Sequence, residues 1–156
     1  MRLPPEGERL LLDVVADGFT VYCCGPLSAP IALAACYEWG EWLDHIIIRH
    51  WDHAVAARLP KRGRVDPFAP ELVVWSYEGP AEPTLRALLA LIHPSHPHAP
   101  RTCDPAPRDL HVPRHQQRPM RIRVPAPNWA GARAARLARV WGVEPDRSVS
   151  HLATKR

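Results

Sequence analysis

The densest hydrophobic pattern in the chain lies between residues 31 and 59, and we interpret it as two or three strands of an antiparallel meander. The isoleucines at 46–48 are three consecutive β-branched side chains, which suit a pleated sheet better than a helix. Gly40 marks one turn, and the stretch 50–52 marks a second. An amphipathic helix over 41–59 is the alternative, because apolar side chains there also recur at helical spacing.

Shorter patterns on either side of this meander predict two helices and two further strands. Apolar positions recur at helical spacing between Pro4 and Asp17, and they do so again between residues 82 and 92. Residues 19–24 and 71–79 are rich in β-branched and aromatic side chains, which is typical of strands. In the second of these strands, we expect the face with the bulkier side chains to point toward the core. That face carries Val73, Trp75 and Tyr77.

Together these elements predict an α+β fold. We expect an antiparallel sheet of about four to five strands, with an N-terminal helix and a helix after the last strand. Residues 94–127 hold nine prolines, a density that excludes a long helix and most sheet pairing, and only 120–124 resemble a strand. We therefore divide the chain into an α+β core domain (1–93), a proline-rich extended segment (94–127), a short basic helix (128–142) and a flexible tail (143–156).

Cysteine usage and hydropathy predict a cytoplasmic protein. The four cysteines form no CxxC pair, so we expect reduced thiols. The N-terminal residues lack the basic and apolar regions of a secretory signal. No apolar run approaches the length of about 18 residues that a membrane-spanning helix needs, and we expect no membrane association.

The net charge of +4 conceals two halves of opposite sign. Residues 1–94 carry 8 basic and 12 acidic side chains, a net of −4, whereas residues 95–156 carry 12 basic and 4 acidic ones, a net of +8. The basic half either docks on the acidic half or binds an anionic partner. No pattern for specific base recognition is present, so nucleic-acid binding would be nonspecific. The candidate residues are Arg118, Arg121, Arg123, Arg133, Arg136 and Arg139, of which the last three are expected to lie away from the apolar face of their helix.

A histidine-rich stretch after the second predicted helix supplies the most metal-like residues. Imidazole and thiolate groups are good zinc ligands, and three histidines and one cysteine fall within 93–103. The spacing matches no zinc finger and prolines separate the ligands, so a polar, proline-rich loop is the alternative. The candidate ligands are His93, His96, His98 and Cys103.

A second group of polar residues, His50, Asp52 and His53, is the candidate acid–base site. A general base needs an orienting partner and a pocket, so this hypothesis predicts that His50 and Asp52 converge in one pocket. Exposed side chains, or buried ones satisfied by hydrogen bonds, are the alternative. Motifs for dinucleotides, nucleoside triphosphates, zinc peptidases, serine hydrolases and calcium loops are absent from the sequence, and we expect no cofactor.

The chain resembles small uncharacterised proteins of high-GC actinobacteria in three runs: YEWGEWLDHIIIRHWDHAVAARLP, VDPFAPELVVWSYEGP and LRALLALIHPSHP. The resemblance would cover about residues 1–130 of the sequence. It implies a bacterial, cytosolic origin, and it implies no activity and no functional residues.

These patterns lead to three hypotheses of function. The first is a non-enzymatic macromolecular interaction module whose proline-rich basic segment binds a protein partner, since proline-rich chains lose less entropy on ordering. The second is a nonspecific nucleic-acid-binding or regulatory accessory protein that uses the basic C-terminal region. The third is a small enzyme with a His/Asp site in residues 44–53.

Overall fold

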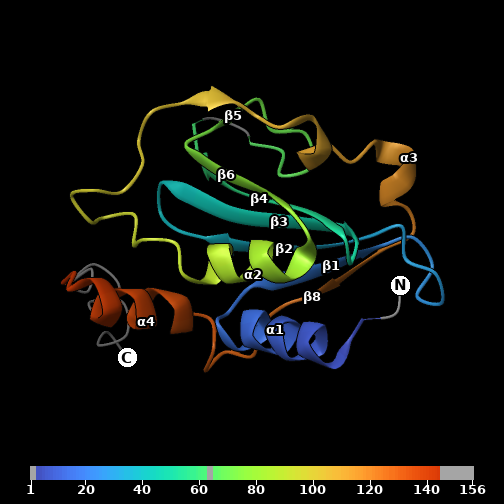
Figure 1. Ribbon diagram of the computed structural model, residues 1–156, viewed down its shortest axis with the longest axis horizontal. Helices are drawn as coiled ribbons and strands as arrows, with labels where there is room; N and C mark the ends of the chain where they lie inside the picture. The colour runs from blue at the N-terminus through green and yellow to red at the C-terminus, as the bar shows by residue number, and fades with distance from the viewer. Residues whose placement is uncertain (1–2, 63–64, 145–156) are drawn as a thin grey trace, which may run out of the picture.

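A six-stranded antiparallel sheet lies at the centre of the fold, as shown by a computed structural model that describes residues 3–62 and 65–144 (Figure 1). The strands lie in the order β6-β4-β3-β2-β1-β8, so a meander of four consecutive strands is extended by one strand at each edge. The α+β class is confirmed. The bounds of the six strands are β1 (Thr20–Cys24), β2 (Ala32–Glu38), β3 (Trp42–His50), β4 (His53–Pro60), β6 (Trp75–Gly79) and β8 (Met120–Arg123).

The stretch with both strand and helix character forms β3 and β4. Ile46 and Ile48 belong to the core on one side of the sheet and Ile47 to the core on the other, and each is 1% exposed. A strand buries all three because alternate side chains point to opposite faces, whereas a helix buries only one stripe. The strand interpretation is therefore confirmed, and residues 51–52 form the turn between β3 and β4.

Two helices cover one face of the sheet: α1 (Pro5–Ala16) and α2 (Ala81–Leu89). Leu10 and Val14 of α1 and Leu85 of α2 pack with the isoleucines of β3 in one apolar cluster. Figure 1 shows both helices on the same side of the sheet. The two predicted helices are confirmed, although α2 ends about one turn earlier than the apolar pattern indicates.

The opposite face is covered by irregular chain. Phe68, from the loop after β4, packs on Ile47 and Val55 together with Leu110 and Val112 of the proline-rich segment. The proline-rich segment therefore contributes directly to the core.

Short elements accompany this irregular cover. β5 (Leu72–Val73) and β7 (Asp104–Pro105) form a small second sheet, and the 3₁₀-helix η1 (Arg108–Leu110) follows. Figure 1 shows β5 above the main sheet and α1 below it. The main sheet thus lies between a helical layer and a layer of loops.

The proline-rich segment also supplies β8, so the sheet has six strands rather than the four to five that we predicted. β8 pairs antiparallel with β1, with Arg123 opposite Val21 and Arg121 opposite Cys23. Pairing is possible because the nearest prolines, Pro119 and those after Val124, fall outside the strand. An edge strand also needs hydrogen bonds on one side only, which makes neighbouring prolines tolerable.

The predicted strand 71–79 is two strands, because the chain changes sheets at Val74. Val73 and Val74 are buried, but Tyr77 is 39% exposed, so the expectation that Tyr77 meets the core is wrong. Tyr77 lies on β6, which has a neighbouring strand on one side only. Side chains on an edge strand have fewer neighbours to cover them.

After η1, α3 (Arg114–Gln117) leads to β8, and α4 (Ala132–Trp141) ends the described chain. α4 stops at Gly142, whose φ of 65° lies in the left-handed region common after helices. Most of the predicted flexible tail lies outside the described residues. Within 3–62 and 65–144, no helix combines the length and the apolar character needed to cross a bilayer.

Candidate functional site

A buried ion cluster attaches α4 to the acidic front half of the chain. Arg133 is completely buried, and its guanidinium donates hydrogen bonds to Asp44 of β3 at 3.0 and 3.1 Å and to Asp17 at 3.0 Å. The same group donates to the backbone carbonyl of Leu88 at 2.7 Å. At α4 the basic half therefore docks on the acidic half, as one of the two alternatives raised by the charge pattern predicts.

Asp44 is the centre of this cluster. Its carboxylate accepts hydrogen bonds from Nε of Arg58 at 2.7 Å, Nη2 of Arg58 at 3.1 Å and Nε1 of Trp39 at 2.9 Å. Burial by itself would raise the pKa of Asp44, but the guanidinium groups of Arg133 and Arg58 outweigh burial and hold this pKa below its usual value. The cluster is therefore ionised and structural.

Arg136 extends the cluster to the edge of the interior. It donates to the two carboxylate oxygens of Asp17, each at 2.8 Å, and to the carbonyl of Leu89 at 2.8 Å. The hydrogen bonds to Asp17 raise the pKa of Arg136 above its ordinary value. Burial of Arg133 contradicts its expected place on an exposed helix face. The sequence did contain one indication that a basic side chain is buried. Asp44 lies within an apolar strand, and an acid buried there needs a basic partner.

The other four arginine candidates are exposed, and two of them lie together. Arg121 and Arg123 alternate with Ile122 along β8, so they project from the face of the sheet that the helices cover. Arg118 precedes β8, and Arg139 lies on the exposed face of α4. Of the six candidates, Arg121 and Arg123 are the pair that lines a cavity.

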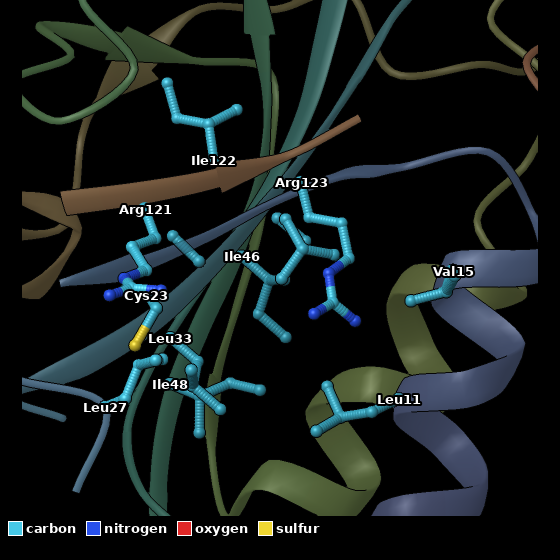
Figure 2. Close-up of a pocket in the computed structure, with 13 residues that line it drawn as sticks. Leu11, Val15, Cys23, Leu27, Leu33, Ile46, Ile48, Arg121, Ile122 and Arg123 are labelled. Carbon is cyan, nitrogen blue, oxygen red and sulfur yellow. The ribbon is translucent and has the colours of Figure 1, made fainter. Parts of the chain in front are cut away.

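A groove of about 430 Å³ opens between α1, the sheet and β8 (Figure 2). Leu11 and Val15 of α1 form one wall, and aliphatic side chains of β1, β2 and β3 form the floor. Figure 2 shows the Arg123 side chain extending into the space between the sheet and Leu11, with Arg121 beside Cys23. The groove is thus apolar inside and basic along one rim.

The width of the sheet explains why this groove is open. Six strands about 4.8 Å apart extend over roughly 24 Å, whereas two helices about 10 Å across cover roughly 20 Å. α2 packs on β6, β4 and β3 with α1 beside it, so the helical cover ends before β8. The inward-facing side chains near β8 therefore remain half-buried, among them Val21, Cys23 and Leu33.

Arg121 and Arg123 are electrostatically uncompensated within the described part of the chain. The ion pairs found among residues 3–62 and 65–144 involve other basic groups. Two positive charges without carboxylate partners, placed beside an aliphatic surface, favour a ligand with an anionic head and an apolar body.

His50 and Asp52 meet on an exposed turn. The backbone N–H of Asp52 donates to Nδ1 of His50 at 3.1 Å, and the Asp52 carboxylate lies 3.5 Å from the same nitrogen. Their side chains are 70% and 84% exposed. Neither lines the groove, and neither lines a second, more open cavity of about 570 Å³ beside Arg108 and Asp109 of η1. The prediction that they converge in one pocket is therefore wrong. His53 points instead toward Glu78 and Asp109.

The histidine-rich stretch uses its ring nitrogens for local turns. Nδ1 of His93 accepts a hydrogen bond from the N–H of Ser95 at 3.0 Å, and Nδ1 of His96 accepts one from the N–H of His98 at 3.1 Å. The expected ligand set of these three histidines with Cys103 does not assemble in the described chain, where the one group of three possible ligands lies elsewhere.

Cys36 and His45 form a buried pair, with Sγ of Cys36 2.7 Å from Nδ1 of His45. Burial raises the pKa of the Cys36 thiol well above its usual value, and burial lowers the pKa of His45 to about 4. Both groups are therefore neutral at neutral pH. A catalytic cysteine needs thiolate character and access to a substrate, so this pair is a core contact.

Comparison with known proteins provides no relative from which a function could be transferred. No family model matches the chain, and neither curated proteins nor solved structures give a match. The groove beside β8 combines an apolar floor with two arginines that have no carboxylate partner among the described residues.

Proposed function

We propose that this chain is a non-enzymatic binding domain that holds an aliphatic carboxylate in the groove beside β8. The single observation behind the proposal is the combination of an aliphatic floor with Arg121 and Arg123 at the rim. A guanidinium matches a carboxylate through two parallel hydrogen bonds. The groove volume of about 430 Å³ also lies within the range of roughly 300–1,000 Å³ typical of small-molecule sites.

The aliphatic floor supplies most of the expected affinity. Each methylene that leaves water for an apolar contact contributes about 0.8 kcal/mol, or roughly a fourfold decrease in Kd. Leu11, Val15 and Leu33 are half-buried without a ligand, so covering them removes further apolar surface from water. Affinity should therefore rise with chain length until the groove is filled.

The two arginines determine the charge of the preferred ligand. Arg121 and Arg123 are exposed, so each contact with a carboxylate contributes about 1 kcal/mol or less and is screened by salt. This contribution is sufficient to favour a carboxylate over an alcohol or an amine of the same length. It is too small to bind a short acid that leaves the apolar floor uncovered.

We favour a small ligand over the macromolecular partner expected from the sequence. Arg133 and Arg136 are engaged with Asp17 inside the fold, which reduces the expected basic surface of six arginines. Nucleic acids bind through several phosphate contacts, each of which needs an accessible cation. The apolar floor between α1 and β8 offers nothing to a phosphate backbone.

Isothermal titration calorimetry of the full chain with octanoate, decanoate and dodecanoate tests this function. We expect affinity to increase about fourfold per added methylene until the groove is filled. Decanol should bind about fivefold more weakly than decanoate, because it lacks the charge. The double substitution Arg121→Gln with Arg123→Gln should weaken decanoate binding about fivefold and leave decanol binding unchanged.

The matched control is the double substitution Arg118→Gln with Arg139→Gln, which removes the same charge outside the groove. It should leave decanoate affinity within a factor of about two. An equal loss in both double variants would show a general effect of net charge and contradict the assignment of the groove. Failure of all three carboxylates to bind would refute the proposed function itself.

A further inference from the structure

On the face of the sheet opposite the groove, three metal-ligating side chains converge from distant parts of the sequence. Glu78 of β6 is paired with Val55 of β4, and His53 lies two positions before Val55, so both side chains project from one face. η1 packs on that face through Leu110, which brings its neighbour Asp109 above His53 and Glu78. No local pattern connects the three residues.

Two of the three distances within this group match those of a tetrahedral metal site. Nε2 of His53 lies 3.3 Å from Oε1 of Glu78 and 3.2 Å from Oδ2 of Asp109, and the three ligand atoms are within 4.8 Å of one another. Zinc bonds of about 2.0–2.1 Å at tetrahedral angles place neighbouring ligand atoms about 3.3–3.4 Å apart. The two distances from Nε2 of His53 therefore suit a tetrahedral ion, and the two carboxylate oxygens, which lie within 4.8 Å of each other, can adjust by rotation of their side chains.

We propose that His53, Glu78 and Asp109 form a binding site for a zinc-type divalent cation, with one coordination position open. An imidazole and two carboxylates are ligands that zinc takes in proteins, and three protein ligands leave the fourth position for water or another donor. The side chains are 37–48% exposed, so an ion can enter from solvent. This site is separate from the groove and does not depend on the proposed carboxylate ligand.

The backbone around Asp109 is held in place by an independent contact. Nη2 of Arg49, on β3, donates to the carbonyl of Asp109 at 3.1 Å and to the carbonyl of His111 at 2.6 Å. These bonds attach η1 to the main sheet and keep Asp109 near His53 without a bound ion. A ligand set that is already assembled loses less entropy when the metal binds.

The competing arrangement is an imidazolium of His53 between two carboxylates. An N–H at Nε2 can align with only one oxygen at a time, and it makes a hydrogen bond with Glu78 while the Asp109 oxygen lies equally near. A cation at the centre satisfies both carboxylates together. Only the metal-site arrangement predicts that added zinc binds at these three side chains.

Titration of the full chain with Co²⁺, followed by displacement with Zn²⁺, tests the site. Tetrahedral Co²⁺ absorbs visible light strongly, so the spectrum reports the geometry as well as the binding. We expect one ion per chain. Each of His53→Gln, Glu78→Gln and Asp109→Asn should weaken zinc binding at least tenfold and leave the circular dichroism spectrum unchanged.

The double substitution His96→Asn with His98→Asn removes two histidines outside the proposed site, and it should leave zinc affinity within twofold. Loss of binding in this control would assign the ion to those histidines. Undiminished affinity in the three ligand variants, or no binding by the unaltered chain, would equally overturn the proposal. Mg²⁺ should not displace Co²⁺, because magnesium prefers octahedral oxygen ligands.

Discussion

Single buried polar residues have a large influence on this fold. Arg133 donates two hydrogen bonds to the Asp44 carboxylate inside the protein, where either charge alone would cost several kcal/mol. His45 differs from them, because its Nε2 has no hydrogen-bond partner among the described residues. Its ring contacts Cys36 and lies perpendicular to the ring of Phe68, and no described ion pair or hydrogen bond joins it to a carboxylate that could stabilise a positive charge. His45 therefore stays neutral in the folded protein and makes stability depend on pH.

We expect the protein to lose stability as the pH falls from 6.5 to about 4. Burial lowers the pKa of His45 from 6.5 to about 4, so within this range the unfolded chain binds a proton that the folded chain does not. The free energy of unfolding should fall by about 3 kcal/mol across the range. Urea titrations at several pH values measure it, and the substitution His45→Leu should flatten the profile.

Other titrating groups provide the controls for this pH profile. Burial also lowers the pKa of His93, which contributes in the same direction, so His93→Asn is the companion variant. Asp44 contributes mainly at more acidic pH, because its pKa lies below its usual value. If stability were constant over the range, or if His45→Leu left the slope unchanged, the assignment to His45 would be incorrect.

Among the helices and strands, α4 shows how an ion pair can orient an amphipathic helix. Its apolar pattern places Ala134 and Leu137 inward, and both do contact the interior. Arg133 is also inward, where its guanidinium lies 5.1 Å from the ring of Phe19 and reaches Asp44 on β3. The helix is therefore held by apolar packing and by a buried charge together.

The substitution Arg133→Met should destabilise the protein by about 3 kcal/mol or more, because Asp44 then keeps only Arg58 as a charged partner inside the protein. Arg139→Met removes the same charge from an exposed position on the same helix and should change stability by about 0.5 kcal/mol or less. Urea denaturation compares the two variants. Similar small effects in both would mean that the buried cluster makes no net contribution.

For the protein as a unit, the proline-rich segment is part of the folded structure. Leu110 and Val112 complete the core on one face of the sheet, and the N–H of Val112 donates to the carbonyl of Phe68 at 2.8 Å. β8 then adds a strand to the same sheet. Prolines suit such a cover, because a restricted backbone loses less entropy on folding.

We expect a chain cut after residue 93 not to unfold cooperatively. It would lack β8, the apolar cover from Leu110 and Val112, and the partner that Arg133 provides to Asp44. A chain cut after residue 144 is the control and should retain a sharp transition. Tryptophan fluorescence in urea distinguishes the two. A sharp transition in the shorter chain would restore the division between a core domain and an appended segment.

Local pattern was sufficient for α1 and α2, because each helix buries a stripe of apolar side chains that recurs at helical spacing. It favoured the β3–β4 hairpin but left a helix open, because both faces of these strands are buried and their apolar side chains also recur at helical spacing. Proline count was misleading for 94–127, because composition does not show which backbone N–H groups a sheet or loop needs. The burial of Arg133, the groove beside β8 and the group around His53 depend on residues that only the folded sheet brings together. The spacing of these residues along the chain does not predict their contacts, because strand order and register decide which distant segments meet.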